Sequence, residues 1–368
     1  MQLSLGKTNH RQVCTMLKLV YQNLNINRMF VGETLAIDRA MVTHIYNYLV
    51  EQGWLIEQES TLKRLPLVLN ENRIYAAGVE IQPEYQVLVI TNLRGKVLFE
   101  KRFSETVRDI VGFLKNTVCP AIEKSGLTVA GLGIAVPGIV LPTERKILRS
   151  VPFGPDAEIQ LPEVLFINKE AVPLFLDNDV RCWGWGRVAF DKESSSFFVF
   201  LQHFIESKEN PELIKRISGG SAFFANGKPC IGANSCGGEL PGIFRIEEFR
   251  SLHIGEDERE TLKSNKENQE KFIKNYALIV SYLATVFDVK KVYLAGFENF
   301  DKASLIQKIE KYSSEYCLYP DFQKHEIVFE NDDATKTAYG ACGLVFEELI
   351  VRPCETESID SRIFPKKA

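Results

Sequence analysis

The spacing of apolar residues changes near Arg73, and this change divides the chain into two kinds of structure. Before Arg73, apolar residues recur every three or four positions, as they do in amphipathic helices. After it, apolar runs at 75–81, 86–91 and 96–99 predict successive strands, with a turn at 92–95. The sequence therefore predicts a small helical head followed by a large α/β body.

The head, residues 9–56, has the pattern of helices joined by short connections. In the first predicted helix, Val13, Leu17 and Val20 share one face, and a second short segment covers 31–36. The third predicted helix runs from Arg39 to Gln52, and its apolar face consists of Val42, Ile45, Tyr46 and Leu49.

Both ends of this third helix carry recognisable signals. Asp38 is a suitable N-cap, because its carboxylate can accept hydrogen bonds from the first-turn amides, and Gly53 is a typical C-terminal residue. Two short helices joined by a tight turn, the second amphipathic, are typical of a helix-turn-helix. Strands at 54–56 and 65–69 around a Lys63–Arg64 tip would extend it to a winged helix. The residues predicted to contact DNA are Arg28, Arg39, Thr43, His44, Asn47, Lys63 and Arg64.

Charge and cysteine content limit the possible functions. The net charge is −4, which excludes a protein coated by nucleic acid along its length, although residues 1–66 contain seven basic and five acidic side chains. The alternative for the head is a three-helix packing module without DNA contacts. None of the eight cysteines forms a CxxC pair, and no stretch is apolar enough to span a membrane. We therefore expect a cytoplasmic protein with reduced thiols.

The body repeats its α/β pattern. A helix over 107–125 precedes a buried strand that ends at Pro137-Gly138. The second half begins with strands at 197–201 and 221–225. A helix at 275–287 and a strand at 291–296 follow. This repetition predicts a duplicated α/β body with a cleft between its halves.

Four segments, taken in order, make the chain resemble the ROK family of repressors, open reading frames and kinases. They are 26–45, 131–140, 176–180 and 226–239. The resemblance implies an actin-like, sugar-kinase-like (ribonuclease H-like) α/β body below a winged helix-turn-helix head. It divides the chain into a head at 1–70, lobes at 71–190 and 191–352, and a polar tail at 353–368.

The resemblance also implies a carbohydrate site. Its predicted ligand-binding residues are Gly138, Asn178, Asp179 and Glu239. Carboxylate and carboxamide groups suit this role, because they form paired hydrogen bonds with adjacent sugar hydroxyls. In the family's kinases, the aspartate that matches Asp179 acts as the general base on the sugar hydroxyl.

The chain departs from the family's kinases at both phosphate loops. The first loop reads Glu80-Ile-Gln-Pro-Glu84, without glycine, where Pro83 has no amide to donate and Glu84 would repel phosphate. The second corresponds to 216–222 and keeps only part of its glycine content. The family's zinc-binding histidine falls on Gly242, and no cysteine cluster follows. We expect no catalysis, no metal and no cofactor.

The sequence thus predicts a transcriptional regulator, expected to be a repressor of carbohydrate metabolism genes, with a sugar or sugar-derivative effector. The expected partner is a double-stranded, pseudo-palindromic operator, bound by a homodimer or homotetramer. Two alternatives remain open. One is an ATP-dependent sugar kinase with an accessory head, and the other is a DNA-binding regulator whose cleft has lost its ligand.

Overall fold

The computed structural model describes residues 7–57, 65–154, 158–206, 210, 213–240, 261–298, 300–319, 321, 323–331 and 334–353. Contacts divide the chain into two compact units. The first contains residues up to Lys192 and from Thr337 onward, and the second contains Glu193–Lys336. None of the described helices is long and apolar enough to cross a membrane.

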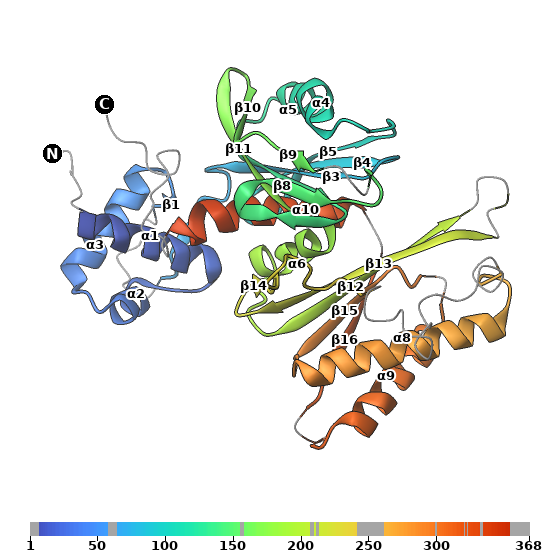
Figure 1. Ribbon diagram of the computed structural model, residues 1–368. Coiled ribbons are helices and arrows are strands. Elements are labelled where there is room, and N and C mark those ends of the chain that lie inside the picture. Colours follow the sequence, from blue (N-terminus) through green and yellow to red (C-terminus); the bar gives the residue numbers. More distant parts are fainter. Residues whose placement is uncertain are drawn as a thin grey trace. The chain divides into compact units, whose positions relative to one another are not determined.

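The head contains α1 (Lys7–Gln22), α2 (Arg28–Leu35) and α3 (Arg39–Glu51) (Figure 1). The predicted apolar faces are confirmed, because Val13, Leu17 and Val20 of α1 and Val42, Ile45, Tyr46 and Leu49 of α3 are all buried. Removing such side chains from water is the main contribution to packing a module of this size.

The caps of α3 agree with the sequence prediction. The Asp38 carboxylate accepts a hydrogen bond from the Met41 amide at 2.8 Å, and Gly53 adopts a left-handed φ of 73°. Ala36 also has a left-handed φ, 51°, and forms the tight turn between α2 and α3. Such a turn fixes the angle between the two helices of a helix-turn-helix.

The predicted wing is present as two short strands. β1 (Leu55–Ile56) and β2 (Val68–Leu69) pair antiparallel, and a further bridge joins Asn27 to Pro66. The predicted tip residues, Lys63 and Arg64, lie outside the described residues.

The main sheet of the first unit has the order β10-β11-β6-β3-β4-β5. These strands are β3 (Tyr75–Ile81), β4 (Gln86–Asn92), β5 (Val97–Phe103), β6 (Val129–Val136), β10 (Val164–Ile167) and β11 (Glu170–Asn178). A smaller sheet joins β7 (Ile139–Leu141), β8 (Lys146–Arg149) and β9 (Ile159–Gln160), and a 3₁₀ turn, η2, covers Pro142–Glu144.

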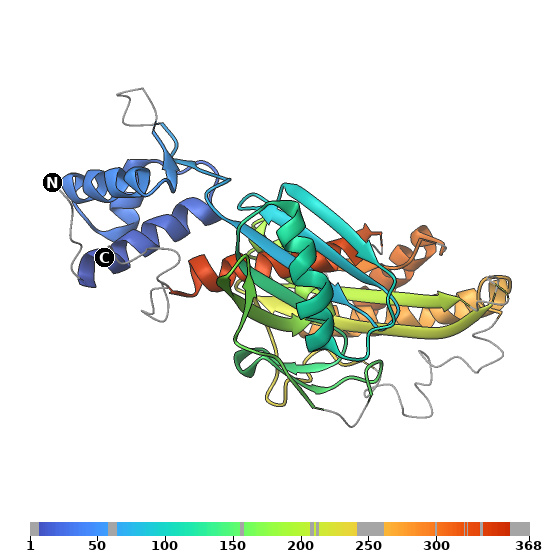
Figure 2. The same ribbon diagram turned by 90° about the horizontal axis from the view of Figure 1, so that it is seen from above.

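Helices cover both faces of the main sheet (Figures 1 and 2). The predicted helix over 107–125 is confirmed as α4 (Ile110–Phe113), a π-helical turn η1 (Leu114–Val118) and α5 (Cys119–Ser125), which pack on one face. On the other face lie α6 (Asp179–Ala189) and α10 (Ala334–Phe346), and α10 continues into a π-helical turn, η4 (Glu347–Val351). Because strand side chains alternate, Glu80 of β3 points to the α6 face while Val79 and Ile81 point to α4 and α5.

Two strand glycines explain why most of α10 belongs to the first unit. A Cβ atom at Gly78 would lie 2.0 Å from the carbonyl oxygen of Ala338, and one at Gly133 would lie 2.1 Å from that of Ala341. The missing side chains therefore let the helix backbone rest directly on the sheet. The division by contacts assigns residues from Thr337 onward to the first unit, whereas the sequence division placed 191–352 in one lobe.

The second unit has a sheet of order β14-β13-β12-β15-β16. Its strands are β12 (Phe197–Glu206), β13 (Ile214–Ala225), β14 (Lys228–Pro229), β15 (Lys291–Ala295) and β16 (Glu326–Glu330). Among the described residues of this unit, the helices α8 (Lys266–Val286) and α9 (Lys302–Tyr316) form one apolar core with the sheet. Helix α8 begins nine residues before the predicted position, because the Asn265 side chain caps it by accepting from the amides of Glu267 and Asn268.

The segment that corresponds to the second phosphate loop is a strand in this protein. Gly219 pairs with Gln202 and Gly220 pairs with Leu201 in the antiparallel ladder of β12 and β13. A phosphate loop needs several backbone amides converging on one point, whereas ladder amides point alternately to either side of their strand. The residues that the sequence analysis matched to a phosphate loop with reduced glycine content, 216–222, thus lie within β13.

Candidate DNA interface and ligand site

Helix α3 presents a polar stripe. Arg39, Thr43 and Asn47 are four residues apart and exposed, so they lie on one side of the helix, and His44 beside them is half-buried. The Thr43 hydroxyl donates to the Arg39 carbonyl at 2.9 Å. The apolar face opposite is anchored in the head, which leaves this stripe free to enter a major groove.

Arg28 lies at the start of α2, and its side chain stacks on Tyr46 of α3. The Arg28 guanidinium carbon lies 3.7 Å from the centre of the buried Tyr46 ring. A cation stacked on an aromatic face keeps its outward N–H groups available for a phosphate. Of the predicted DNA-contacting residues, the structure brings Arg28, Arg39, Thr43, His44 and Asn47 onto two adjacent helices of one head.

The predicted ligand residues Gly138 and Asn178 are joined to each other. Asn178 caps α6, because its Oδ1 accepts from the amides of Val180 at 3.0 Å and Arg181 at 3.3 Å. Its Nδ2 donates to the Gly138 carbonyl oxygen at 3.1 Å. Gly138 has a left-handed φ of 122°, and a Cβ there would lie 2.3 Å from the Arg149 carbonyl oxygen. This pair therefore holds the β6 turn against the start of α6.

Asp179 follows directly and is tied to the first strand. Its Oδ2 accepts a hydrogen bond from Nε2 of Gln82 at 3.2 Å, and its Oδ1 accepts from the Val180 amide at 2.9 Å. The same Gln82 nitrogen lies 3.3 Å from Oε1 of Glu80, which is fully buried. Gln82 thus bridges two acidic side chains at the position where the kinases have a glycine, and sequence reasoning noticed the lost glycine but not this contact.

A second buried polar group supports α6 from below, and sequence reasoning missed it. Asp177, 2% exposed, accepts from Nε of Arg181 at 2.5 Å and from Nε1 of Trp185 at 2.9 Å. In the sequence, Asp177 at the end of β11 precedes Arg181 by four residues and Trp185 by eight. This spacing is the signal that could have indicated the group. Buried charges that are paired in this way fix the start of α6, and with it Asn178 and Asp179.

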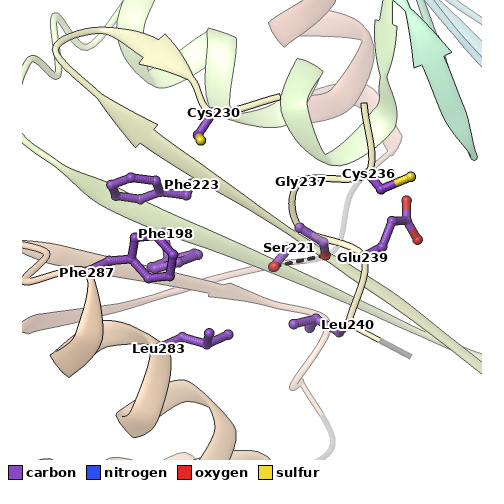
Figure 3. Close-up of a pocket in the computed structure, with 11 residues that line it drawn as sticks. Phe198, Ser221, Phe223, Cys230, Cys236, Gly237, Glu239, Leu240, Leu283 and Phe287 are labelled. Carbon is purple, nitrogen blue, oxygen red and sulfur yellow. Dashed lines mark hydrogen bonds between the residues drawn. The ribbon is translucent and has the colours of Figure 1, made fainter. Parts of the chain in front are cut away.

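Glu239, the remaining predicted ligand residue, lies in the second unit at the end of a tightly packed loop. The Ser221 amide and hydroxyl both donate to the Gly238 carbonyl, at 3.1 and 3.0 Å. A Cβ at Gly238 would lie 1.9 Å from the Ser221 carbonyl oxygen, so only glycine fits beside β13 at that position. The loop thereby fixes Glu239 at the edge of a pocket of about 290 Å³ (Figure 3).

The head is attached to the body of the first unit through the end of α1. Arg94, in the β4–β5 turn, donates from Nη1 to the Tyr21 carbonyl at 3.0 Å. The Tyr21 hydroxyl donates to the Ala189 carbonyl at 3.3 Å, and the Lys192 ammonium lies 3.6 Å from the centre of the Tyr21 ring. Burial lowers the pKa of Lys192 to about 7, although Glu347 nearby opposes the shift. No sequence motif marks this junction, because its members come from distant segments.

Within the described part of the chain, no three His, Cys, Asp or Glu side chains are grouped so as to hold a metal ion. The segment in which the family's zinc ligands would fall, including Gly242, lies outside the described residues.

Comparison with known proteins agrees with the resemblance seen in the sequence. Residues 76–202 match the model of the ROK family, the family that the sequence resembles. The chain is 23% identical over 188 residues to the xylose repressor of Caldicellulosiruptor bescii, an alignment that covers 47% of this chain and 46% of that protein. It is 24% identical over 189 residues to the xylose repressor of Bacillus subtilis, covering 48% of each. The chain thus aligns with about half the length of these curated relatives.

Solved structures confirm the fold. The chain superposes on a ROK family transcriptional regulator described as a homologue of the E. coli MLC protein, with a TM-score of 0.67, 13% identity, and coverage of 95% of this chain and 99% of that one. A ROK family glucokinase from Streptomyces griseus, solved with glucose and AMPPNP, gives a TM-score of 0.51 and 13% identity, with 73% and 98% coverage. At these identities the likeness shows the fold: a sugar-kinase-like α/β body, and in the regulator a fold that extends over the head as well.

Proposed function

We propose that this protein is a sequence-specific DNA-binding transcriptional regulator, a repressor of carbohydrate genes, whose body binds a carbohydrate effector. The observation that carries the proposal is the polar stripe of α3, Arg39, Thr43 and Asn47, on a capped helix-turn-helix. In this model, Arg39 and Asn47 contact base edges while Arg28 and the wing residues Lys63 and Arg64 contact the backbone.

The relatives supply the effector class. The curated proteins that the chain resembles are named xylose repressors. Asn178 and Asp179 at the start of α6, and Glu239 in the second unit, each carry polar groups of the kind that bind hydroxyls. We expect the effector to be a pentose or hexose, or a derivative of one.

The contact between Gln82 and Asp179 argues against the kinase alternative. The kinases have a glycine where this chain has Gln82, and the Gln82 side chain, which donates to the Asp179 carboxylate, occupies space that a glycine would leave open for phosphate. Pro83 cannot donate an amide to a phosphate, and Gly219 and Gly220 lie within a ladder. A coupled ADP-release assay over a monosaccharide panel tests this point, and turnover that disappears in Asp179→Asn would establish the kinase.

The regulator would act as a homodimer or homotetramer on a pseudo-palindromic operator, because a two-fold arrangement of heads reads two inverted half-sites. An effector that binds one arrangement of the oligomer better than another would change operator affinity by that difference in binding energy.

Selection of genomic DNA fragments by the purified protein, at a stated salt concentration and with or without each sugar, tests the proposal. We expect enrichment of a short inverted repeat near sugar-uptake or sugar-catabolic genes, and a change in enrichment with one sugar. Enrichment that no sugar changes would favour the alternative of a regulator without a ligand. The absence of any enrichment would make the head a packing module.

A further inference from the structure

The pocket beside Glu239 is more apolar than a sugar site. Its volume is about 290 Å³, and its walls come from β12, β13, the loop after β14 and the end of α8 (Figure 3). The lining residues are Phe198, Ser221, Phe223, Cys230, Cys236, Gly237, Gly238, Glu239, Leu240, Leu283 and Phe287. Glu239 is the one charged side chain in this set.

Three phenylalanine rings form one wall. The ring centres of Phe223 and Phe287 are 4.8 Å apart, those of Phe198 and Phe223 are 5.1 Å apart, and those of Phe198 and Phe287 are 5.4 Å apart. These spacings are those of mutually packed aromatic rings, so each ring holds the others in place. Phe198 is fixed in β12, whereas Phe287 is 44% exposed at the end of α8 and leaves this side of the pocket accessible.

The pocket has few polar side chains, and the Ser221 hydroxyl already takes part in a hydrogen bond within the protein. The Ser221 hydroxyl donates to the Gly238 carbonyl inside the loop. Figure 3 shows Glu239 and Cys236 on the side of the pocket away from the phenylalanine rings. A free monosaccharide buried here would leave most of its hydroxyls without partners, at a cost of about 1–3 kcal/mol for each. The lining therefore suits an apolar group.

The size of the pocket indicates what kind of group fits. A dry cavity of about 150 Å³ lined by aliphatic and phenyl side chains binds benzene. A pocket of about 290 Å³ has room for one ring with its substituents.

We propose that the effector is a glycoside whose apolar ring, the aglycone, enters this pocket, while a hydroxyl of its sugar is bound by Glu239. The ring would stack on the wall of Phe198, Phe223 and Phe287. This inference rests on the proposed function, which supplies the sugar, and it narrows the effector class to a sugar with an apolar substituent.

Calorimetry with matched ligands tests this inference. Free monosaccharides, their methyl glycosides and their phenyl glycosides are titrated into the full-length protein. We expect the phenyl glycoside of the recognised sugar to bind at least about tenfold more tightly than the methyl glycoside. Burying a phenyl ring removes more apolar surface from water than burying a methyl group, and this difference is sufficient for a tenfold gain in affinity.

Two variants place this gain in the pocket. Phe287→Ala removes one ring of the wall, and Cys230→Phe fills the space from an exposed loop position. Both should abolish the advantage of the phenyl glycoside and leave methyl glycoside binding nearly unchanged. Tyr282→Ala is the matched control, because Tyr282 is an exposed aromatic residue of α8 that does not line the pocket, and it should keep the advantage.

Four results would overturn the inference. They are equal affinity for the two glycosides, a phenyl advantage that survives both pocket variants, equal loss of the advantage in Tyr282→Ala, and displacement of the phenyl glycoside by adenosine, which would make the pocket a nucleoside site. If free sugars bind but the ring adds nothing, the proposed function stands and this inference fails. If no sugar or glycoside binds, the inference fails and the DNA selection experiment decides the proposed function on its own.

Discussion

The side-chain nitrogen of Gln82 lies 3.2 Å from Oδ2 of Asp179, although 97 positions separate the two residues. The same nitrogen lies 3.3 Å from Oε1 of Glu80. A single amide therefore bridges two carboxylates at the point where the family's kinases need an open phosphate loop. Gln82 stands where the kinases have a phosphate-loop glycine, and its side chain has a structural role instead.

Replacing Gln82 tests that structural role. Gln82→Leu removes the shared donor from Glu80 and Asp179, and leaving buried carboxylates without it should cost about 1–3 kcal/mol of stability. Tyr85→Phe removes only the hydrogen bond from a more exposed phenol to Glu80, at 3.3 Å, and should cost less. Thermal unfolding of both variants measures this, and equal melting temperatures for Gln82→Leu and the wild type would refute the bridge.

Substitutions at Asn178 should separate its cap from its donor function. Asn178→Asp keeps an oxygen for the amides of Val180 and Arg181, while Asn178→Ala loses the cap and should cost about 1 kcal/mol. Both variants lose the hydrogen bond to the Gly138 carbonyl. We expect Asn178→Asp to unfold below the wild-type temperature, because it loses the bond to Gly138, but above Asn178→Ala, because it keeps the cap, and to bind effector more weakly. Wild-type affinity in Asn178→Asp would remove Asn178 from the ligand site.

The junction between head and body should give the stability a pH dependence near neutrality. The pKa of Lys192 is lowered to about 7 by burial, whereas in the unfolded chain it is about 10.4. Between these values the unfolded chain binds more protons, so stability rises with pH, by at most about 1.4 kcal/mol per pH unit. Below about pH 7 the cost of burying the ammonium is fully present.

A variant without the ammonium isolates this effect. Lys192→Met keeps the apolar stem against Tyr21 and removes the titration. We compare the free energy of unfolding of the variant and the wild type from pH 6 to pH 9.5. The two values should converge as pH rises, and near pH 6 the variant should gain stability relative to the wild type, because it buries no ammonium. Parallel curves across this range would show that Lys192 has an ordinary pKa.

The cysteines should differ in reactivity. Burial raises the pKa of Cys119 to about 11 and that of Cys342 to about 12, and it also raises the pKa of Cys182. Cys230 and Cys236 are exposed. Alkylation of the native protein at pH 8, followed by mass spectrometry, should modify Cys230 and Cys236 and leave the three buried thiols unmodified, because the thiolate is the reactive form. Early labelling of Cys342 would contradict the packing of α10 on the first sheet.

Much of the head could be predicted from sequence because its signals are local. The cap at Asp38, the helix end at Gly53 and the apolar face of α3 are each indicated by residues that are close together in the sequence. The wing strands were also predicted, from short apolar runs on either side of a basic pair. Such patterns depend little on the rest of the fold.

The body resisted prediction where contacts join distant segments. No local pattern indicates that Gln82 meets Asp179, or that Lys192 lies over the ring of Tyr21. Gly219 and Gly220 resemble a loop in the sequence, yet the unbroken register from Phe197↔Phe224 to Ile205↔Arg216 between β12 and β13 places them inside a ladder, because tertiary pairing overrides the weak preference of glycine for turns.

The proposed reading of DNA sequence by α3 can be measured as operator affinity for defined duplexes. The duplexes are the selected operator and a scrambled sequence of equal length, titrated at several salt concentrations with the wild type, Arg39→Ala/Asn47→Ala and the control Lys101→Ala, an exposed residue of β5. We predict that the double variant loses most of the preference for the operator, about 1–3 kcal/mol for each lost base contact, while Lys101→Ala keeps it. An unchanged preference in the double variant would show that α3 does not read the sequence.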